Sequence, residues 1–267
     1  MCQLLSQIKL TLKWAFRDRI FYAVIGVGLF ILFLVPIFSS FSMRQVQELS
    51  ITLALSFNAF FLLVMAILLG SVSFWREIDR RYAHSVLSLP VSRLVFILGK
   101  FFGISIFLLI CTLILGLISS FLILLATSTY PSDIHINWKN ILVAMLSDYI
   151  KCLLVVSFAI FFSTVSTSFY LPFFSTIAIY FSGSATQQVY DYVSGKYGED
   201  LSGFSIIVSK LLYYLLPNLS VLDYKLYAIY SLDIDFNRIF IAFLYSLIYI
   251  SIVVVFSIST FSRRQFS

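Results

Sequence analysis

Long uninterrupted apolar segments constrain this chain more than any other feature of its sequence. A helix needs roughly 20 apolar residues to cross the ~30 Å hydrocarbon core of a bilayer. Six segments reach that length: Ile20–Phe41, Leu49–Phe74, Leu94–Ala126, Ile141–Phe162, Phe169–Thr186 and Ile239–Phe261. Because 61% of the 267 residues are hydrophobic and only 11% are charged, a water-soluble core cannot bury this much apolar surface. The sequence therefore predicts a single all-α integral membrane domain, residues 1–267, with six transmembrane helices.

A seventh apolar segment is too short to be read as a span. Phe204–Leu216 has about 13 residues and contains Lys210, which favours an interfacial or re-entrant helix. It belongs to residues 187–238, the largest exposed segment between two predicted spans, which we expect on the extracytoplasmic side of the membrane.

The distribution of lysine and arginine predicts the orientation of the chain. These residues gather before the first span, between the second and third spans, and after the last span. Cytoplasmic connectors carry such an excess, so both termini and the connector at residues 75–93 are expected in the cytoplasm. The protein is accordingly predicted in the plasma membrane (the inner membrane of a bacterium). Residues 1–19 carry an apolar stripe opposite Lys9, Lys13 and Arg17, which predicts an amphipathic helix in the inner interface; an ordinary basic flank is the alternative.

The connector at residues 75–93 is longer and more charged than topology requires. Its apolar residues recur at three- and four-residue steps, charged residues occupy the other faces, and Pro90 ends the pattern. A helix with apolar anchors and a charged rim is suited to the groove of a soluble partner. A solvated, positively charged loop is the alternative.

Motifs for catalysis are absent from the sequence. It contains no G-x-x-x-x-G-K-[ST] phosphate loop, and its two histidines, His84 and His135, lie far apart. We therefore expect no catalytic residue, no metal site, no cofactor and no nucleic-acid partner, and any nucleotide hydrolysis must come from another protein.

The connector and the start of the third predicted span resemble the ABC-2 type permeases. The segments Trp75–Arg81, Val86–Arg93 and Ile97–Gly103 carry the resemblance, including the Leu-x-x-Pro-Val-Ser-Arg turn and the Gly-Lys-Phe-x-Gly start of the span. Weaker matches in the same order extend it over nearly the whole chain. One departure is Tyr82-Ala83, where many members have Gly-Thr.

The resemblance implies that the connector is a coupling helix docked on a separate ABC ATPase subunit. It also implies two ATPase copies working with two permeases, the second permease being an identical copy or a homologue. By position, the candidates for the ATPase contact are Glu77, Arg80, Arg81, Tyr82, Leu87, Pro90 and Arg93.

A few polar or small residues within the predicted spans are further candidates. Gly99 and Gly103 form a small-x-x-x-small pair that lets helices approach closely. The pair is interpreted either as a helix-packing contact or as a hinge for gating. Asp148 and Lys151 lie three residues apart, and neither should face lipid. They are interpreted either as a mutually neutralising buried pair or as a contact with substrate or a second permease. Asn58, in the second predicted span, is a weaker candidate for the same substrate path, with a hydrogen bond between helices as the alternative.

The predicted function is therefore that of a transmembrane permease subunit of an ABC exporter. Three alternatives remain at this level. The chain could be a non-transporting subunit that transmits force to envelope proteins or lipids, a self-sufficient secondary carrier, or a receptor that binds a cytoplasmic protein through the connector. The substrate does not follow from the sequence.

Overall fold

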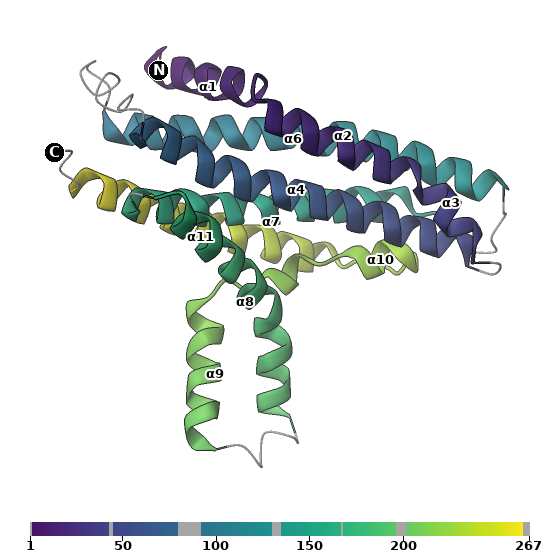
Figure 1. Cartoon of the computed structure of the whole chain (residues 1–267). Coiled ribbons are helices and arrows are strands. Elements are labelled where there is room, and N and C mark those ends of the chain that lie inside the picture. The colour runs from purple at the N-terminus through teal and green to yellow at the C-terminus, as the bar shows by residue number, and fades with distance from the viewer. Residues whose placement is uncertain are drawn as a thin grey trace.

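The computed structural model describes residues 2–42, 45–79, 92–129, 135–166, 168–195 and 202–263. Every regular element within these residues is a helix, as the apolar segments predict. Figure 1 shows the longest helices side by side in one bundle, from which a helical hairpin projects. A helix suits an apolar environment because it satisfies its own backbone hydrogen bonds within one segment.

Five stretches of the described chain are long and apolar enough to cross a membrane. Four are single helices and one is a pair of helices in sequence. In chain order they are α2 (Arg19–Phe33) with α3 (Val35–Ser40), α4 (Val46–Asp79), α6 (Arg93–Thr129), α7 (Trp138–Val165) and α11 (Phe236–Arg263). The predicted first, second, third, fourth and sixth spans therefore coincide with these stretches.

The first span is divided where the sequence predicts continuity. Helix α2 ends at Phe33 and α3 begins at Val35, with Pro36 in its first turn. Proline lacks a backbone N–H and fits the first turn of a helix, so Pro36 explains why a new helix begins there.

The fifth predicted span, Phe169–Thr186, differs most from the structure. It lies in α8 (Tyr170–Ser194), which continues beyond Thr186 through the polar residues Gln187 and Asp191. Helix α8 is not among the five stretches that meet the length and apolarity criteria. Instead, α9 (Gly203–Leu215) and the chain at Leu219–Ile229 form a pair bent by 48°, which would make a sixth span or a re-entrant loop.

Helices α4, α6 and α7 form the centre of the bundle. Helix α4 packs against both α6 and α7, and α7 also contacts α11 and α8. The α4–α7 contact is close because Gly70 faces Ala159, so a methyl group at Gly70 would clash with the Cβ atom of Ala159. Small residues at helix crossings permit such approach in membrane bundles.

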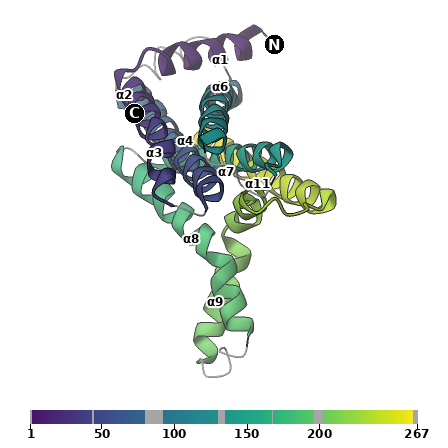
Figure 2. The same cartoon turned by 90° about the vertical axis from the view of Figure 1, so that its right-hand side faces the viewer.

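Helix α1 (Cys2–Ala15) lies against α6 at one end of the bundle. Figure 2 looks nearly along the long helices and shows α1 crossing above them from the side. Thr11 and Ala15 are buried, whereas Lys9 and Lys13 are exposed. Helix α1 therefore packs one face against α6 and leaves the face with the lysines exposed, as the amphipathic pattern of residues 1–19 predicts.

The segment after the fourth span forms a hairpin and then returns to the bundle. The C-terminal part of α8 and helix α9 run antiparallel and project away from the long helices (Figures 1 and 2). The rings of Tyr190 and Tyr213 stack between them with centroids 4.2 Å apart. The chain then re-enters through the short helices η2 (Leu219–Leu222) and α10 (Lys225–Ile229).

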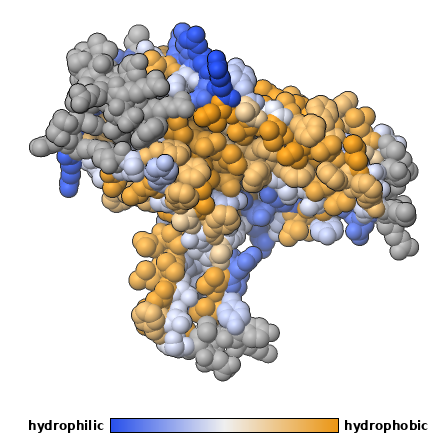
Figure 3. Space-filling model, viewed as in Figure 1, coloured by the Kyte–Doolittle hydropathy of each residue, from blue (hydrophilic) through white to orange (hydrophobic). Residues whose placement is uncertain are grey.

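Both chain ends lie at the same end of the bundle, together with the helix ends that flank residues 80–91 (Figure 1). The cytoplasmic location of this end of the bundle stays a prediction. Figure 3 shows apolar residues over most of the visible flank of the bundle and over the hairpin. Exposed apolar side chains on α9 include Phe204 and Tyr214, each 77% exposed.

Candidate functional site

Helix α6 begins at Arg93, the last residue of the predicted coupling helix. Of the seven residues predicted to contact an ATPase, Arg93 is described together with its side chain. Glu77 belongs to the last turns of α4, and its side chain lies outside the described residues. The remaining five also lie outside them: Arg80, Arg81, Tyr82, Leu87 and Pro90.

Arg93 is hydrogen-bonded to the C-terminal end of α11. Its Nη1 atom donates to the carbonyl oxygens of Phe261 at 2.9 Å and Ser262 at 2.7 Å. The last carbonyls of a helix lack intrahelical partners, and a cation there is stabilised by the helix dipole. The start of α6 itself is capped by Ser92, whose Oγ atom accepts from the backbone N–H of Val95 at 3.4 Å.

Aromatic and cationic side chains extend this contact into the bundle. The rings of Phe96 and Phe261 stack with centroids 5.7 Å apart and an interplanar angle of 10°. The Nζ atom of Lys100 lies 5.2 Å from the centroid of the Phe96 ring, a favourable cation–π distance. Lys100 is only 1% exposed and Phe261 is fully buried, so these residues join α6 to α11 away from solvent.

Gly99 and Gly103 lie on the face of α6 that contacts α1. A Cβ atom at Gly99 would lie 2.6 Å from the Cβ atom of Gln7, and one at Gly103 would lie 2.7 Å from the Cβ atom of Thr11. Both distances are shorter than side chains tolerate, so the two glycines set the separation of α1 and α6. The pair therefore serves packing with the N-terminal helix in this structure.

A buried charge cluster lies in the middle of α7. Asp148 is 4% exposed, and its carboxylate lies 3.7 Å from the Nζ atom of Lys151. A second ammonium group, that of Lys225 in α10, lies 4.0 Å from the same carboxylate. Asp148 is ten residues beyond Trp138, the start of α7, or about 15 Å along the helix axis.

Lys225 is a site residue that the sequence does not single out. Asp148 and Lys151 are neighbours on one helix, and their spacing predicts the pair. Lys225 comes from a segment far along the chain, and no local pattern links it to Asp148. The contact exists because the chain folds back onto α7 after the α8–α9 hairpin.

Asn140 anchors the chain that follows the α8–α9 hairpin to the N-terminal part of α7. Its Nδ2 atom donates to the carbonyl oxygens of Tyr227 at 2.9 Å and Leu232 at 2.7 Å. Ser231, whose φ angle is 50°, donates from its hydroxyl to the carbonyl oxygen of His135 at 2.9 Å. Residues 219–232, which we call the return segment, are therefore tied to α7 by hydrogen bonds and by the Lys225–Asp148 ion pair.

The third candidate for a substrate path, Asn58, has a different partner. Its Nδ2 atom donates to the hydroxyl of Ser119 at 2.9 Å, which links α4 to α6. Its Oδ1 atom is buried and has no hydrogen-bond partner among the described residues. The structure thus brings Asp148 and Lys151 together with Lys225, while Asn58 takes part in a separate helix–helix contact.

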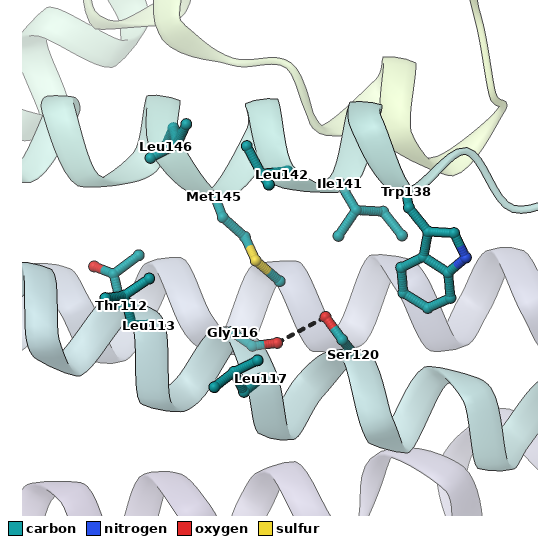
Figure 4. Close-up of a pocket in the computed structure, with 10 residues that line it drawn as sticks. All are labelled: Thr112, Leu113, Gly116, Leu117, Ser120, Trp138, Ile141, Leu142, Met145 and Leu146. Carbon is teal, nitrogen blue, oxygen red and sulfur yellow. Dashed lines mark hydrogen bonds between the residues drawn. The ribbon is translucent and has the colours of Figure 1, made fainter.

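An apolar groove of about 290 Å³ lies between α6 and α7. Figure 4 shows side chains from both helices facing it, with Trp138 at one end and Gly116 at its floor beside Met145. Its two hydroxyl groups are engaged within α6: Ser120 donates to the carbonyl oxygen of Gly116 and Thr112 to that of Leu108, both at 2.8 Å. The groove can therefore contact an alkyl chain, and it offers little hydrogen bonding to a polar solute.

Comparison with known proteins gives a match over almost the whole chain. A family model described as "ABC-2 family transporter protein" matches residues 11–266. The matched region includes every described helix except the first part of α1. A search of the curated proteins finds no match.

Proposed function

The chain belongs to the ABC-2 transporter family, and from this premise we propose that it exports a substrate with energy from a separate ATPase subunit. The family match confirms the resemblance drawn from the connector, and it makes the chain a permease subunit of an ABC transporter. The proposal adds the direction of transport, the ATPase contact through residues 75–93, and an assembly of two permeases with two ATPase subunits.

The observation that supports the ATPase contact is the position of the two helices that flank the connector. Helices α4 and α6 pack together, and α4 ends at Asp79 and α6 begins at Arg93 at the same end of the bundle. A force applied to the connector therefore acts on two central helices at once. ATP can drive such a change only if the ATPase binds the two permease conformations with different affinities, which a docked lever between α4 and α6 provides.

The return segment supports a role for the outer part of the chain in closing the exit. It is held on α7 by Asn140 and by the ion pair of Lys225 with Asp148. Charges in an apolar environment are costly and are retained mainly at functional or tightly paired positions. We assign the cluster the role of a latch that holds the return segment against α7 until substrate leaves.

A second permease packed against α9 would cover the apolar side chains that this helix exposes. None of the residues of α9 is buried in the single chain, and several of its large apolar side chains are more than half exposed. Exposed apolar surface of this kind is covered either by lipid or by another protein. A second copy or a homologue on this side would form the substrate path between two permeases.

Co-purification tests whether an ABC ATPase subunit binds the chain through the connector. The full chain is expressed in its host with an affinity tag, and the proteins that remain bound after detergent extraction are identified. We expect an ABC ATPase subunit with the wild-type chain and its loss when residues 80–91 are replaced by a flexible Gly/Ser linker of the same length. A control replaces residues 196–200 in the same way and should keep the ATPase. An ATPase that stays bound without the connector would contradict the proposal.

A further inference from the structure

Helix α11 contacts the end of the connector at one point and the outer turn at another. We infer that α11 relays movement of the connector to the outer turn at residues 215–218, with Arg93 and Tyr249 as positioning residues at its two contacts. The inference rests on the proposed function, because it assumes that an ATPase moves the connector.

The inner contact lies directly after the connector. Arg93 is the first residue of α6, and one guanidinium nitrogen donates to two successive carbonyl groups at the end of α11. The planar guanidinium group fixes the direction of these bonds, which a lysine ammonium cannot do. A shift of Arg93 therefore moves the end of α11 with it, or breaks both bonds.

Helix electrostatics indicate that Arg93 is positioned for α11 rather than for its own helix. A cation at a helix N-terminus opposes the helix dipole, whereas a cation at a C-terminus is stabilised by it. Arg93 occupies the N-terminus of α6 and reaches the C-terminus of α11. The favourable interaction is thus the one between the two helices.

The outer contact joins α11 to the turn that follows α9. The hydroxyl of Tyr249 donates to the carbonyl oxygen of Leu215 at 2.7 Å. The hydroxyl of Tyr245 accepts from the backbone N–H of Asn218 at 3.0 Å. Helix η2, which follows this turn, is tied to α8 by Ser220, whose hydroxyl donates to the carbonyl oxygen of Ser184 at 2.8 Å.

The two contacts are on one continuous helix. Residues 249 and 261 are separated by twelve positions, or about 18 Å along the axis of an α-helix. Helix α11 runs without a break from Phe236 to Arg263 and packs against α7 and α6. Because a packed helix moves as a unit, a displacement imposed at Arg93 is carried to Leu215 and Asn218.

A distance measurement on the intact complex tests this relay. The three native cysteines are replaced by alanine, and spin labels are placed at Lys210 on α9 and Leu124 on α6, both exposed. The permease is purified with its ATPase, and the label distance is recorded with and without a non-hydrolysable ATP analogue. We expect a nucleotide-dependent shift in the wild type and its loss in those Arg93→Gln complexes that retain their ATPase.

Tyr249→Phe provides a second test that does not depend on the folding of the arginine variant. It removes only the hydroxyl that bonds Leu215, and it should also abolish the shift. The control is Arg263→Gln, an exposed arginine in the last turn of α11, which should leave the shift unchanged. A shift that persists in Tyr249→Phe, or in a folded Arg93→Gln complex, overturns the relay. A wild-type chain that holds no ATPase would instead contradict the proposed function.

Discussion

The ammonium group of Lys225 lies 4.0 Å from the carboxylate of Asp148, although the two residues come from segments on either side of the α8–α9 hairpin. Their contact closes the return segment onto the middle of α7. It also gives Asp148 a second cation besides Lys151, so that one buried carboxylate lies beside two ammonium groups.

Asp148→Asn should destabilise the folded chain. The substitution leaves the ammonium groups of Lys151 and Lys225 near each other without the carboxylate between them. Removing one partner of a buried ion pair costs about 3 kcal/mol. Thermal unfolding of the purified protein in detergent measures the loss. Asp233→Asn, at an exposed position in the loop before α11, is the control and should unfold like the wild type; equal stability of the two variants would contradict a structural role for the cluster.

Asn140→Ala should loosen the return segment without unfolding the bundle. The variant loses both hydrogen bonds to the carbonyl groups of Tyr227 and Leu232. A loss of about 1–2 kcal/mol in local stability makes amide hydrogen exchange roughly 5 to 30 times faster. Exchange measured by mass spectrometry should rise in residues 219–232 and stay constant in α4. Asn237→Ala, at an exposed position, should change neither region.

Gly103→Ala should weaken the contact between α1 and α6. The added methyl group would lie 2.7 Å from the Cβ atom of Thr11, so the helices must separate. Overpacking of this kind typically costs about 1–3 kcal/mol. Gly26→Ala is a matched control, because a Cβ atom at Gly26 has no neighbour within 4 Å. Thermal unfolding should distinguish the two, and a Gly103→Ala protein as stable as Gly26→Ala would show that α1 is not held by this contact.

Glu77→Lys should uncouple the ATPase while leaving membrane insertion intact. Glu77 lies at the end of α4 and is a predicted contact of the connector with the ATPase. A like-charge juxtaposition at an interface costs several kcal/mol, which corresponds to a loss of more than roughly tenfold in affinity. The stimulation of ATP hydrolysis by the permease is the readout. Asp233→Lys applies the same charge reversal to the loop before α11, and it should keep the stimulation. Full stimulation by Glu77→Lys would remove this residue from the interface.

The helices of the bundle could be predicted from the sequence because the bilayer fixes the length of an apolar span. The helical position of Asp148 beside Lys151 follows equally from local spacing. Helix α8 was harder to delimit, since its polar C-terminal part packs against α9 and does not follow the apolar segment. Apolar composition continues through the break before Pro36, so the apolar segment predicts one continuous helix there.

Contacts between distant segments could not be predicted in this way. The bonds of Arg93 with Phe261 and of Lys225 with Asp148 depend on how helices pack, and no sequence pattern encodes them. Its place in a motif predicts that Arg93 contacts the ATPase, whereas its described hydrogen bonds are to α11. The side chains of the other predicted ATPase contacts lie outside the described residues, and their roles stay predictions.

The fit of α1 to α6 has a consequence for engineered chimaeras of this chain. Since Gln7 and Thr11 rest where Gly99 and Gly103 lack side chains, the two helices are complementary in shape. A foreign amphipathic helix of equal charge and apolarity would not seat on this surface unless its own small and large residues matched. Exchanging the N-terminal helix between related permeases therefore requires the facing turns of α6 to be exchanged with it.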